Sequence, residues 1–163
     1  MDAIEMLKSQ HREVESLFAK FEQLGDNAAK SKQSIVDKIA DALAMHATIE
    51  EKHFYPAVKA KRTEDILLEA LEEHLGIKRV IADLLKIQAS DDTFDAKVKV
   101  LKEQVEHHVK EEESDLFPKV RKVLDKTELT SLAATMERTM KVLMEKGDAR
   151  KSVPAETRAA PTL

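Results

Sequence analysis

The chain contains an eleven-residue stretch twice, and this repeat constrains the fold more than any other feature. The stretch 46–56 (HATIEEKHFYP) aligns with 108–118 (HVKEEESDLFP), so that a His, two Glu, an aromatic residue and a Pro match in register. The helices before the two copies repeat as well, because His11 corresponds to His74 at nearly the same offset. We therefore interpret the chain as two copies of one helical hairpin.

Glycine and proline are scarce, with 3 Gly and 4 Pro in 163 residues, so the helices between them are expected to be long. Apolar residues recur at helical spacing, which predicts helices over about 2–24, 31–58 and 63–88, a fourth after 90–92, and a fifth over about 126–145. Pro56 and Pro118 should kink or end the second and fourth helices. The predicted N-terminal caps are Thr63, the run Ser90-Asp91-Asp92, and Asp125 with Glu128.

Short connections make sequential helices antiparallel. The sequence therefore predicts an all-α fold, an up-down-up-down four-helix bundle with an additional C-terminal helix. Residues 1–146 would form the bundle and the fifth helix. Residues 147–163 show no apolar period and are predicted to be a disordered tail.

Composition excludes several classes of protein. The chain has no Cys, which excludes a disulfide framework, thiolate metal sites and a Cys nucleophile. Charges of both signs are mixed along the chain and give a net charge of −4, which argues against a nucleic-acid partner. No apolar run approaches the roughly 20 residues of a membrane span, and the charged N-terminal residues do not resemble a signal peptide. We expect a cytoplasmic protein without a membrane partner.

Four of the predicted helices each carry one His on the apolar face, and two of them add a Glu one turn later on the same face. At about 1.5 Å of rise per residue, the two His of each hairpin lie level with each other. A buried Glu is costly unless it is paired or bound to a metal. The set predicted to converge on one layer of the core is His11, His46, Glu50, His74, His108 and Glu112.

Imidazole and carboxylate ligands without thiolate suit iron or manganese, with zinc as a further candidate. Two His for each metal and two bridging Glu give four protein donors per ion. A bridging oxo or hydroxo group would make five and leave one position open. The pattern therefore indicates a two-metal centre with ions roughly 3.5–4 Å apart.

This pattern resembles the hemerythrin-like (HHE cation-binding) family, whose motif is H…HxxxE…H…HxxxE, over about residues 1–120 with all six positions filled. The resemblance implies a non-heme centre of two iron ions, bridging carboxylates and oxygen-related chemistry. Oxygen-carrying members place a fifth His one turn after the third, where this chain has Lys78. Some place the last carboxylate one residue later, which would be Glu113. His53 is a candidate additional ligand.

The neighbouring polar residues have plainer interpretations. Glu51 and Glu113 are expected on solvated faces, Lys78 to extend outward, and His107 to be solvated. Tyr55 could hydrogen-bond near the site, although ordinary packing is favoured. A ferritin-like di-iron site would need a second ExxH pair besides Glu50–His53, and the chain lacks it.

The function that this pattern predicts is binding of O2 for storage, delivery or sensing. Two alternatives stay open: an enzyme acting on peroxide or nitric oxide at the same centre, and an iron-responsive interaction module. The small-molecule partner would be O2, another diatomic molecule or a peroxide. Monomer, homodimer and an unidentified protein partner are all compatible with the sequence.

Overall fold

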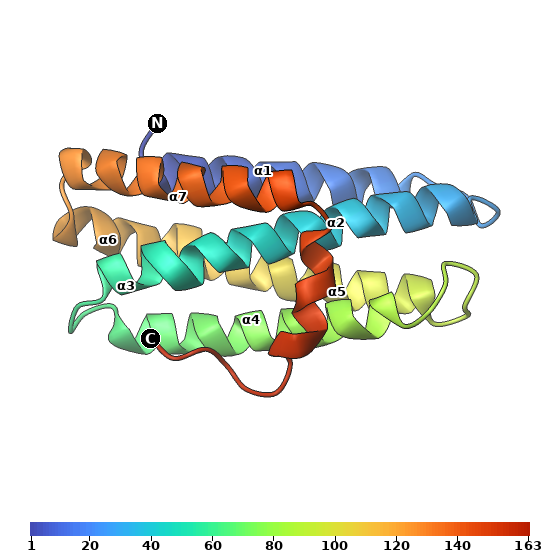
Figure 1. The fold of residues 1–163 in the computed structure, drawn as a ribbon. Helices are drawn as coiled ribbons and strands as arrows, with labels where there is room; N and C mark the ends of the chain where they lie inside the picture. Colours follow the sequence, from blue (N-terminus) through green and yellow to red (C-terminus); the bar gives the residue numbers. More distant parts are fainter.

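A computed structural model describes residues 1–163 and shows a bundle built only of helices. Its long helices are α1 (Ala3–Glu22), α2 (Ala29–Ile49), α4 (Glu64–Leu85) and α5 (Phe94–Glu111). They run alternately up and down, and the α1–α2 and α4–α5 turns lie at the same end (Figure 1). The predicted all-α four-helix bundle with an additional C-terminal helix is confirmed.

Both repeated stretches contain a π-helical segment directly after the α-helix. These segments are η1 (Glu50–Phe54), which leads into α3 (Tyr55–Val58), and η2 (Glu112–Leu116), which leads into α6 (Phe117–Val123). Pro56 and Pro118 follow each segment and cannot donate a backbone hydrogen bond. The wider π turn accommodates each Pro near the start of a short helix, and such turns often mark functional sites.

The additional helix α7 (Lys126–Lys146) packs along α1 and α2. Its buried residues are Leu129, Ala133 and Met136. The predicted capping box is confirmed, because Asp125 accepts from the Glu128 backbone and the Glu128 side chain accepts from the Asp125 backbone.

The other two predicted caps make no side-chain bond to a helix: Thr63 stands at the N-cap position of α4, as predicted, but its hydroxyl bonds elsewhere, and the N-cap of α5 is Thr93, after the predicted run. The Thr63 hydroxyl accepts from the Ala60 backbone and donates to the Val58 carbonyl, so it ties the loop together instead of capping α4. Asp91 accepts hydrogen bonds from Thr93, one residue before α5, and so orders the turn without reaching the helix itself. Local turn bonds compete with capping for such short polar side chains.

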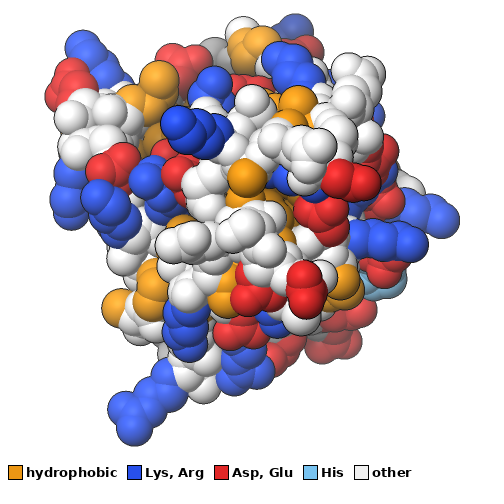
Figure 2. Space-filling model, turned by 90° about the vertical axis from the view of Figure 1, so that its right-hand side faces the viewer, with side chains coloured by type: hydrophobic (Ala, Val, Ile, Leu, Met, Phe, Trp, Pro, Cys, Tyr) orange, Lys and Arg blue, Asp and Glu red, His pale blue; other side chains and the backbone are white.

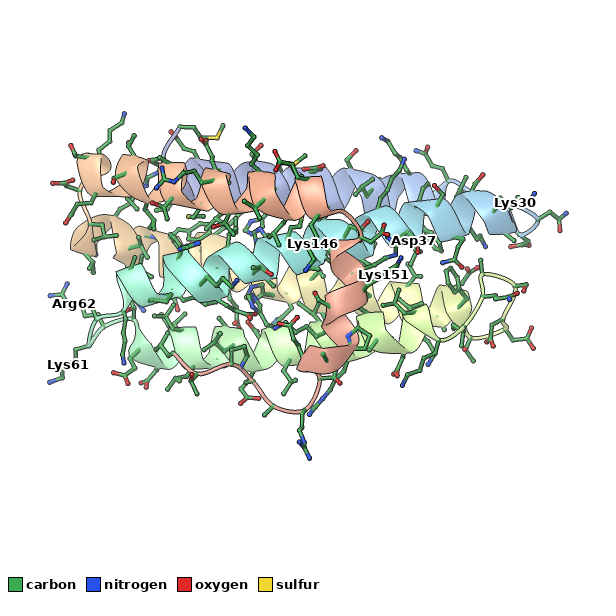
Figure 3. All side chains as sticks on the ribbon, viewed as in Figure 1. Lys30, Asp37, Lys61, Arg62, Lys146 and Lys151 are labelled. Carbon is green, nitrogen blue, oxygen red and sulfur yellow. The ribbon has the colours of Figure 1, made fainter.

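The expected disordered tail is also wrong, because Ala149–Glu156 forms a 3-10 helix, η3, that crosses α2 and α4 (red in Figure 1). We call η3 the C-terminal strap. A single buried apolar residue, Val153, anchors it, and Arg150 Nη1 lies 3.0 Å from Asp41 Oδ2 on α2. One apolar anchor produces no sequence period, which explains why the segment looked like a tail. Figure 3 shows Lys151 on the strap and Asp37 on α2 near this crossing.

The bundle core consists of two apolar clusters separated by a polar layer. One cluster contains Leu7 and Leu71, and the other contains Val14 and Ile81. Between them lie six polar side chains that are each at most 7% exposed: His11, His46, Glu50, His74, His108 and Glu112. Such a layer costs free energy unless its members have partners.

None of the helices combines the length and apolar character needed to cross a membrane. On the end of the bundle in view in Figure 2, Lys and Arg are interspersed with Asp and Glu.

The first helix carries a capping box that the sequence reading missed, and it generates a stability prediction. Asp2 is 3% exposed, accepts from the Glu5 backbone at 2.9 Å and lies 3.1 Å from Arg121 on α6. Asp2→Ala should lower the free energy of unfolding by about 1–2 kcal/mol, because it removes the cap. Asp2→Asn should lose less, because it keeps an oxygen acceptor. Urea unfolding measures both, and equal losses would contradict the cap assignment.

The same carboxylate predicts a pH dependence. Burial opposes ionisation of Asp2, but the Glu5 backbone N–H and Arg121 hold its pKa below the usual 3.8. Its contribution to stability is therefore complete above the unfolded pKa and is lost as the pH falls through the folded pKa. The difference in the free energy of unfolding between wild type and Asp2→Ala, measured by urea unfolding at a series of pH values, should become smaller as the pH falls into the acid range.

Candidate metal centre

The structure brings all six predicted residues into one layer. His11, His46, His74 and His108 come from α1, α2, α4 and α5, and Glu50 and Glu112 are the first residues of the two π segments. His46 Nε2 lies 3.1 Å from Glu50 Oε1, and His108 Nε2 lies 3.2 Å from Glu112 Oε1. Each His therefore faces the carboxylate one turn later on its own helix, as the HxxxE spacing predicts.

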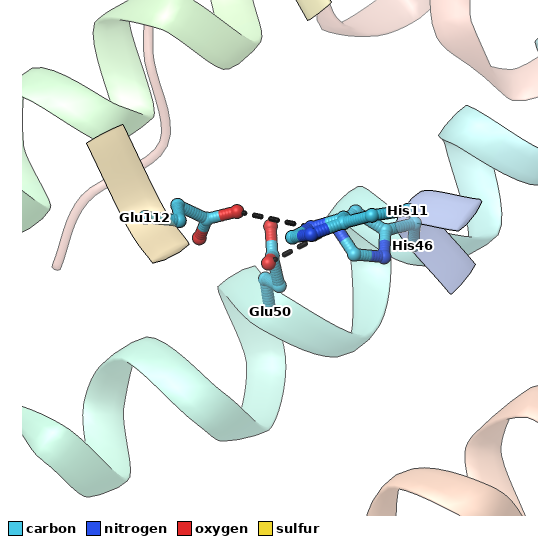
Figure 4. A group of neighbouring side chains, drawn as sticks. All are labelled: His11, His46, Glu50 and Glu112. Carbon is cyan, nitrogen blue, oxygen red and sulfur yellow. Dashed lines mark ion pairs between the residues drawn. The ribbon is translucent and has the colours of Figure 1, made fainter. Parts of the chain in front are cut away.

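Four buried atoms on one side of this layer lack hydrogen-bond partners. They are His11 Nε2, His46 Nε2, Glu50 Oε1 and Glu112 Oε1, and their side chains converge in Figure 4. Their possible ligand atoms all lie within 4.8 Å of one another. Buried polar atoms are nearly always hydrogen-bonded. An arrangement of four orphaned imidazole and carboxylate atoms fits a bound cation.

A second group adjoins the first and shares Glu50 with it. The ligand atoms of Glu50, His74 and His108 also lie within 4.8 Å of one another. The two oxygens of Glu50 face different groups, because Oε1 faces His46 while Oε2 lies 3.0 Å from His74 Nε2. His74 Nε2 and His108 Nε2 are 3.1 Å apart. Glu50 thus belongs to both groups and turns one oxygen toward each of them.

The other ring nitrogen of every His faces a side-chain oxygen outside the layer. The Nδ1 atoms of His11, His46, His74 and His108 lie 2.8, 2.6, 2.7 and 2.7 Å from oxygens of Glu113, Gln10, Glu51 and Glu73. An oxygen acceptor there fixes the proton on Nδ1, so that the Nε2 lone pair is directed to the centre. Metal-binding His residues are usually oriented in this way.

The chain matches the family model of the hemerythrin HHE cation binding domain over residues 2–120. The chain belongs to the hemerythrin HHE cation-binding family. The C-terminal helix α7 and the strap lie beyond the matched region.

Two relatives place this HHE domain among known proteins. A protein named DNA nickase, from Nostoc sp. (strain PCC 7120 / SAG 25.82 / UTEX 2576), is 30% identical over 121 residues, which are 74% of this chain and 34% of that protein. The chain thus spans about a third of that relative's length. A crystal structure of a hemerythrin HHE cation binding domain-containing protein from Mycobacterium kansasii shares the fold, with a TM-score of 0.79 and 24% identity, covering 97% of this chain and 95% of that chain.

The prediction that Glu51 and Glu113 lie on solvated faces is wrong, because both contact imidazoles of the layer. Glu51 supplies the acceptor for His74, and Glu113 supplies the acceptor for His11 and also binds Arg12. Glu51 and Glu113 each come directly after a Glu of the layer. A π segment begins at that Glu, and its wider turn lets both consecutive carboxylates contact imidazoles. Only the EE pair in both repeats offered a sequence signal for this role.

Lys78 points inward, which contradicts the prediction that it extends outward. It is 4% exposed, and its Nζ lies 2.9 Å from Glu51 Oε1 and 3.3 Å from Glu156 Oε1 of the strap. Its charge is therefore satisfied by carboxylates beside the HHE centre. No sequence pattern indicated a partner for Lys78, because Glu156 lies in the segment expected to be disordered.

His53 is not drawn into the layer. Its Nε2 lies 2.7 Å from the Thr139 hydroxyl on α7. A π turn holds more residues than an α turn, so each residue rotates less around the helix axis, and the third residue after Glu50 stops short of the face that Glu50 occupies. The π segment thus carries His53 away from the face that Glu50 occupies.

Tyr55 reaches the centre instead. Its side chain is fully buried, and its hydroxyl lies 3.0 Å from Glu50 Oε2, 2.9 Å from Glu112 Oε2 and 3.2 Å from His74 Nε2. The Tyr55 backbone donates to the Glu50 carbonyl across the π turn, which returns Tyr55 to the same face as Glu50. The assignment to ordinary packing is therefore incomplete. The hydroxyl has one hydrogen and serves one carboxylate at a time.

Electrostatics hold the carboxylates in the form that binds cations. Burial favours neutral Glu50, but His46 and His74 hold its pKa well below the usual range. Burial and the neighbouring Glu50 favour neutral Glu112, but His108 and His11 hold its pKa below the usual value. Burial and the neighbouring carboxylate of Glu112 raise the pKa of Tyr55, which keeps the phenol protonated beside them.

The buried Lys78–Glu51 contact predicts a stability difference between two lysines. Lys78→Met keeps the aliphatic stem but leaves Glu51 without its cation, so it should cost about 3 kcal/mol or more of unfolding free energy. Lys102 pairs with Glu22 on the surface, where side chains are 31% and 55% exposed, so Lys102→Met should cost less than about 1 kcal/mol. Urea unfolding compares them. Equal small losses would show that Lys78 is solvated after all.

Proposed function

We propose that this HHE domain holds two iron ions and binds O2 there, for storage, delivery or sensing. One ion would be held by His11 and His46 and the other by His74 and His108. Glu50 and Glu112 would bridge them, and a solvent-derived oxo or hydroxo group would complete the bridge. The observation that carries this proposal is the set of four orphaned buried atoms facing one another while every Nδ1 is anchored from outside.

The donor set favours a pair of iron ions over a structural zinc in this proposal. Imidazole with carboxylate suits all three ions. A structural zinc site would be a closed tetrahedron, whereas six donors spread over two adjoining groups suit a pair of ions with room for a ligand. An iron pair would supply reversible electron transfer and an open position for a small molecule.

The chain's own residues prepare the centre before any ion arrives. The outer acceptors set the tautomer of each imidazole and fix its orientation. The Tyr55 hydroxyl lies between the outer oxygens of Glu50 and Glu112, and donates to one of them at a time. Because these contacts already exist in the folded chain, metal binding would require little rearrangement.

A peroxide- or nitric-oxide-consuming enzyme is the second candidate, and the environment of Lys78 favours it. The position that supplies a fifth His in oxygen-carrying relatives holds a lysine, and its Nζ is engaged by Glu51 and Glu156. The ion at His74 and His108 would therefore have fewer protein donors. An ion with more open coordination positions favours turnover of peroxide or nitric oxide over reversible binding of O2.

Metal analysis with a visible spectrum tests the proposal. We expect about two iron atoms per chain and near-ultraviolet absorption from a bridged ferric pair. After anaerobic reduction, a reversible O2 adduct would support binding, whereas many turnovers of peroxide or nitric oxide would support the enzyme. A protein that does not bind added ferrous iron would contradict both the O2-binding function and the enzyme.

Individual ligands can be tested against a His that lies outside the layer. His46→Ala and His108→Ala should each sharply lower bound iron, because each removes a donor from one group. His107 is the matched control, since its side chain is 63% exposed and pairs with Glu73 and Glu111 on the surface. His107→Ala should retain full iron content. Equal metal content in all three variants would refute the ligand assignment.

Removing the metal should destabilise the bundle, because it leaves two carboxylates buried without their cations. At a free metal concentration of about 100 times Kd, binding would add roughly 2.7 kcal/mol to the free energy of unfolding. The variant Glu50→Gln, Glu112→Gln should lose this gain while its metal-free form remains folded. Thermal unfolding with and without chelator measures the difference. A metal-independent wild type would contradict the proposal.

A further inference from the structure

A cavity of about 30 Å³ adjoins the candidate centre on one side only. All four His of the layer border it, and apolar side chains from the four long helices form most of its wall, among them Val14, Leu43, Ile77 and Val105. Glu50, Glu112 and Tyr55 do not border it. The carboxylates and the phenol therefore lie on one side of the His layer, and the cavity lies on the other.

The wall of this cavity is completed by a residue outside the bundle. Val153 of the strap is 1% exposed and is the one lining residue that does not come from a long helix. The strap contacts both α2 and α4, and it crosses them on the outside in Figure 1. Val153 therefore covers the cavity on the side between these two helices.

Polar contacts on both sides hold the strap in this position. Arg150 binds Asp41 of α2, and Glu156 contacts Lys78 of α4. Just beyond the strap, Arg79 Nε donates to the Thr157 carbonyl at 3.0 Å. These contacts are partly exposed and individually weak. The cover is therefore ordered, but its release requires no opening of the bundle.

The size and the polarity of the cavity select a class of ligand. A water molecule requires about 10–15 Å³ by this measure, so the space suits a molecule of about two heavy atoms. The polar side chains besides the His are Gln10 and Lys78, and both are already engaged, Gln10 by His46 and Lys78 by Glu51 and Glu156. If the inward Nε2 atoms of the His residues are occupied by metal, as the proposed function requires, a peroxide would lose hydrogen bonds to water without replacement, whereas an apolar gas loses none.

We propose that the C-terminal strap is the gate of this cavity: Val153 closes it and limits the size and the entry rate of the apolar diatomic gas, O2 or nitric oxide, that reaches the His side of the centre. The role of the gas at the metal rests on the proposed function, whereas the cavity and its closure by Val153 do not. The strap lies outside the matched HHE region, so this closure is an addition to the domain.

Xenon tests the cavity without reference to metal. Under xenon pressure, crystals of the wild-type protein should show one xenon atom bordered by Val14, Val105 and Val153. Val153→Phe should remove it, because the larger ring fills the space. Val142→Phe is the matched control, since Val142 is 63% exposed on α7, and it should retain the xenon site. Xenon elsewhere only, or an unchanged site in Val153→Phe, would overturn the proposal.

Nitric oxide binding to the reduced, iron-loaded protein tests the gate. Stopped-flow rates should fall roughly tenfold or more in Val153→Phe. They should rise in Val153→Ala and in Arg150→Ala, which loosens the strap, and stay unchanged in Val142→Phe. Ethyl isocyanide should bind faster to Val153→Ala than to wild type. Rates that do not respond to Val153 would refute the gate, as would peroxide oxidation that responds to Val153→Ala as strongly as nitric oxide does.

The two experiments separate the possible failures. A protein that binds no iron but shows the expected xenon pattern would lose the proposed function and keep the cavity. A protein that binds iron but shows neither response would keep the function and lose this inference. If Val153→Phe fails to fold by circular dichroism, Val153→Ala and Arg150→Ala decide the question, because both only remove atoms.

Discussion

The rest of the structure depends on one arrangement: two carboxylates and four imidazoles buried in the middle of a helical bundle. Apolar side chains could fill the same layer at lower cost, since a buried charge without a partner is expensive. Part of that cost is offset by side chains outside the layer, which give the Nδ1 atom of every His an oxygen acceptor. The atoms that lack a hydrogen-bond partner all face inward. A folded chain that satisfies one ring nitrogen and exposes the other to a common centre is organised around a cation.

The two π segments convert the repeated sequence into this arrangement. In an uninterrupted α-helix, Glu50 and Tyr55 would lie on different faces, and Pro56 would clash with the preceding turn. The wider turn brings Tyr55 back to the layer and lets the consecutive Glu50 and Glu51 both contact His74. Because the second copy has Phe117 in place of Tyr55, the two halves of the centre differ although the repeat suggests symmetry. His11 stacks on Phe117, whereas the phenol contacts the His74 side.

The sequence was sufficient to predict the bundle and the six converging residues because both follow from helical periodicity and from a repeat that checks it. It failed where the answer depends on contacts between distant elements. Lys78 was expected outside because its partners, Glu51 and Glu156, become neighbours only after folding. The strap was expected to be disordered because one buried valine leaves no pattern. An α-helical register favours His53 at the layer, whereas the π turn brings Tyr55 there instead.

The strap also connects the surface of the protein to the centre through charged groups. Glu156 contacts Lys78, Lys78 contacts Glu51, and Glu51 orients the imidazole of His74. The strap segment that covers the cavity therefore also ends at a residue linked to a candidate ligand. Displacing the strap would open the cavity beside Val153 and weaken the hold on Lys78 together, since both depend on one short helix. The closure of the cavity and the orientation of His74 are thus coupled by a segment that lies outside the matched family domain.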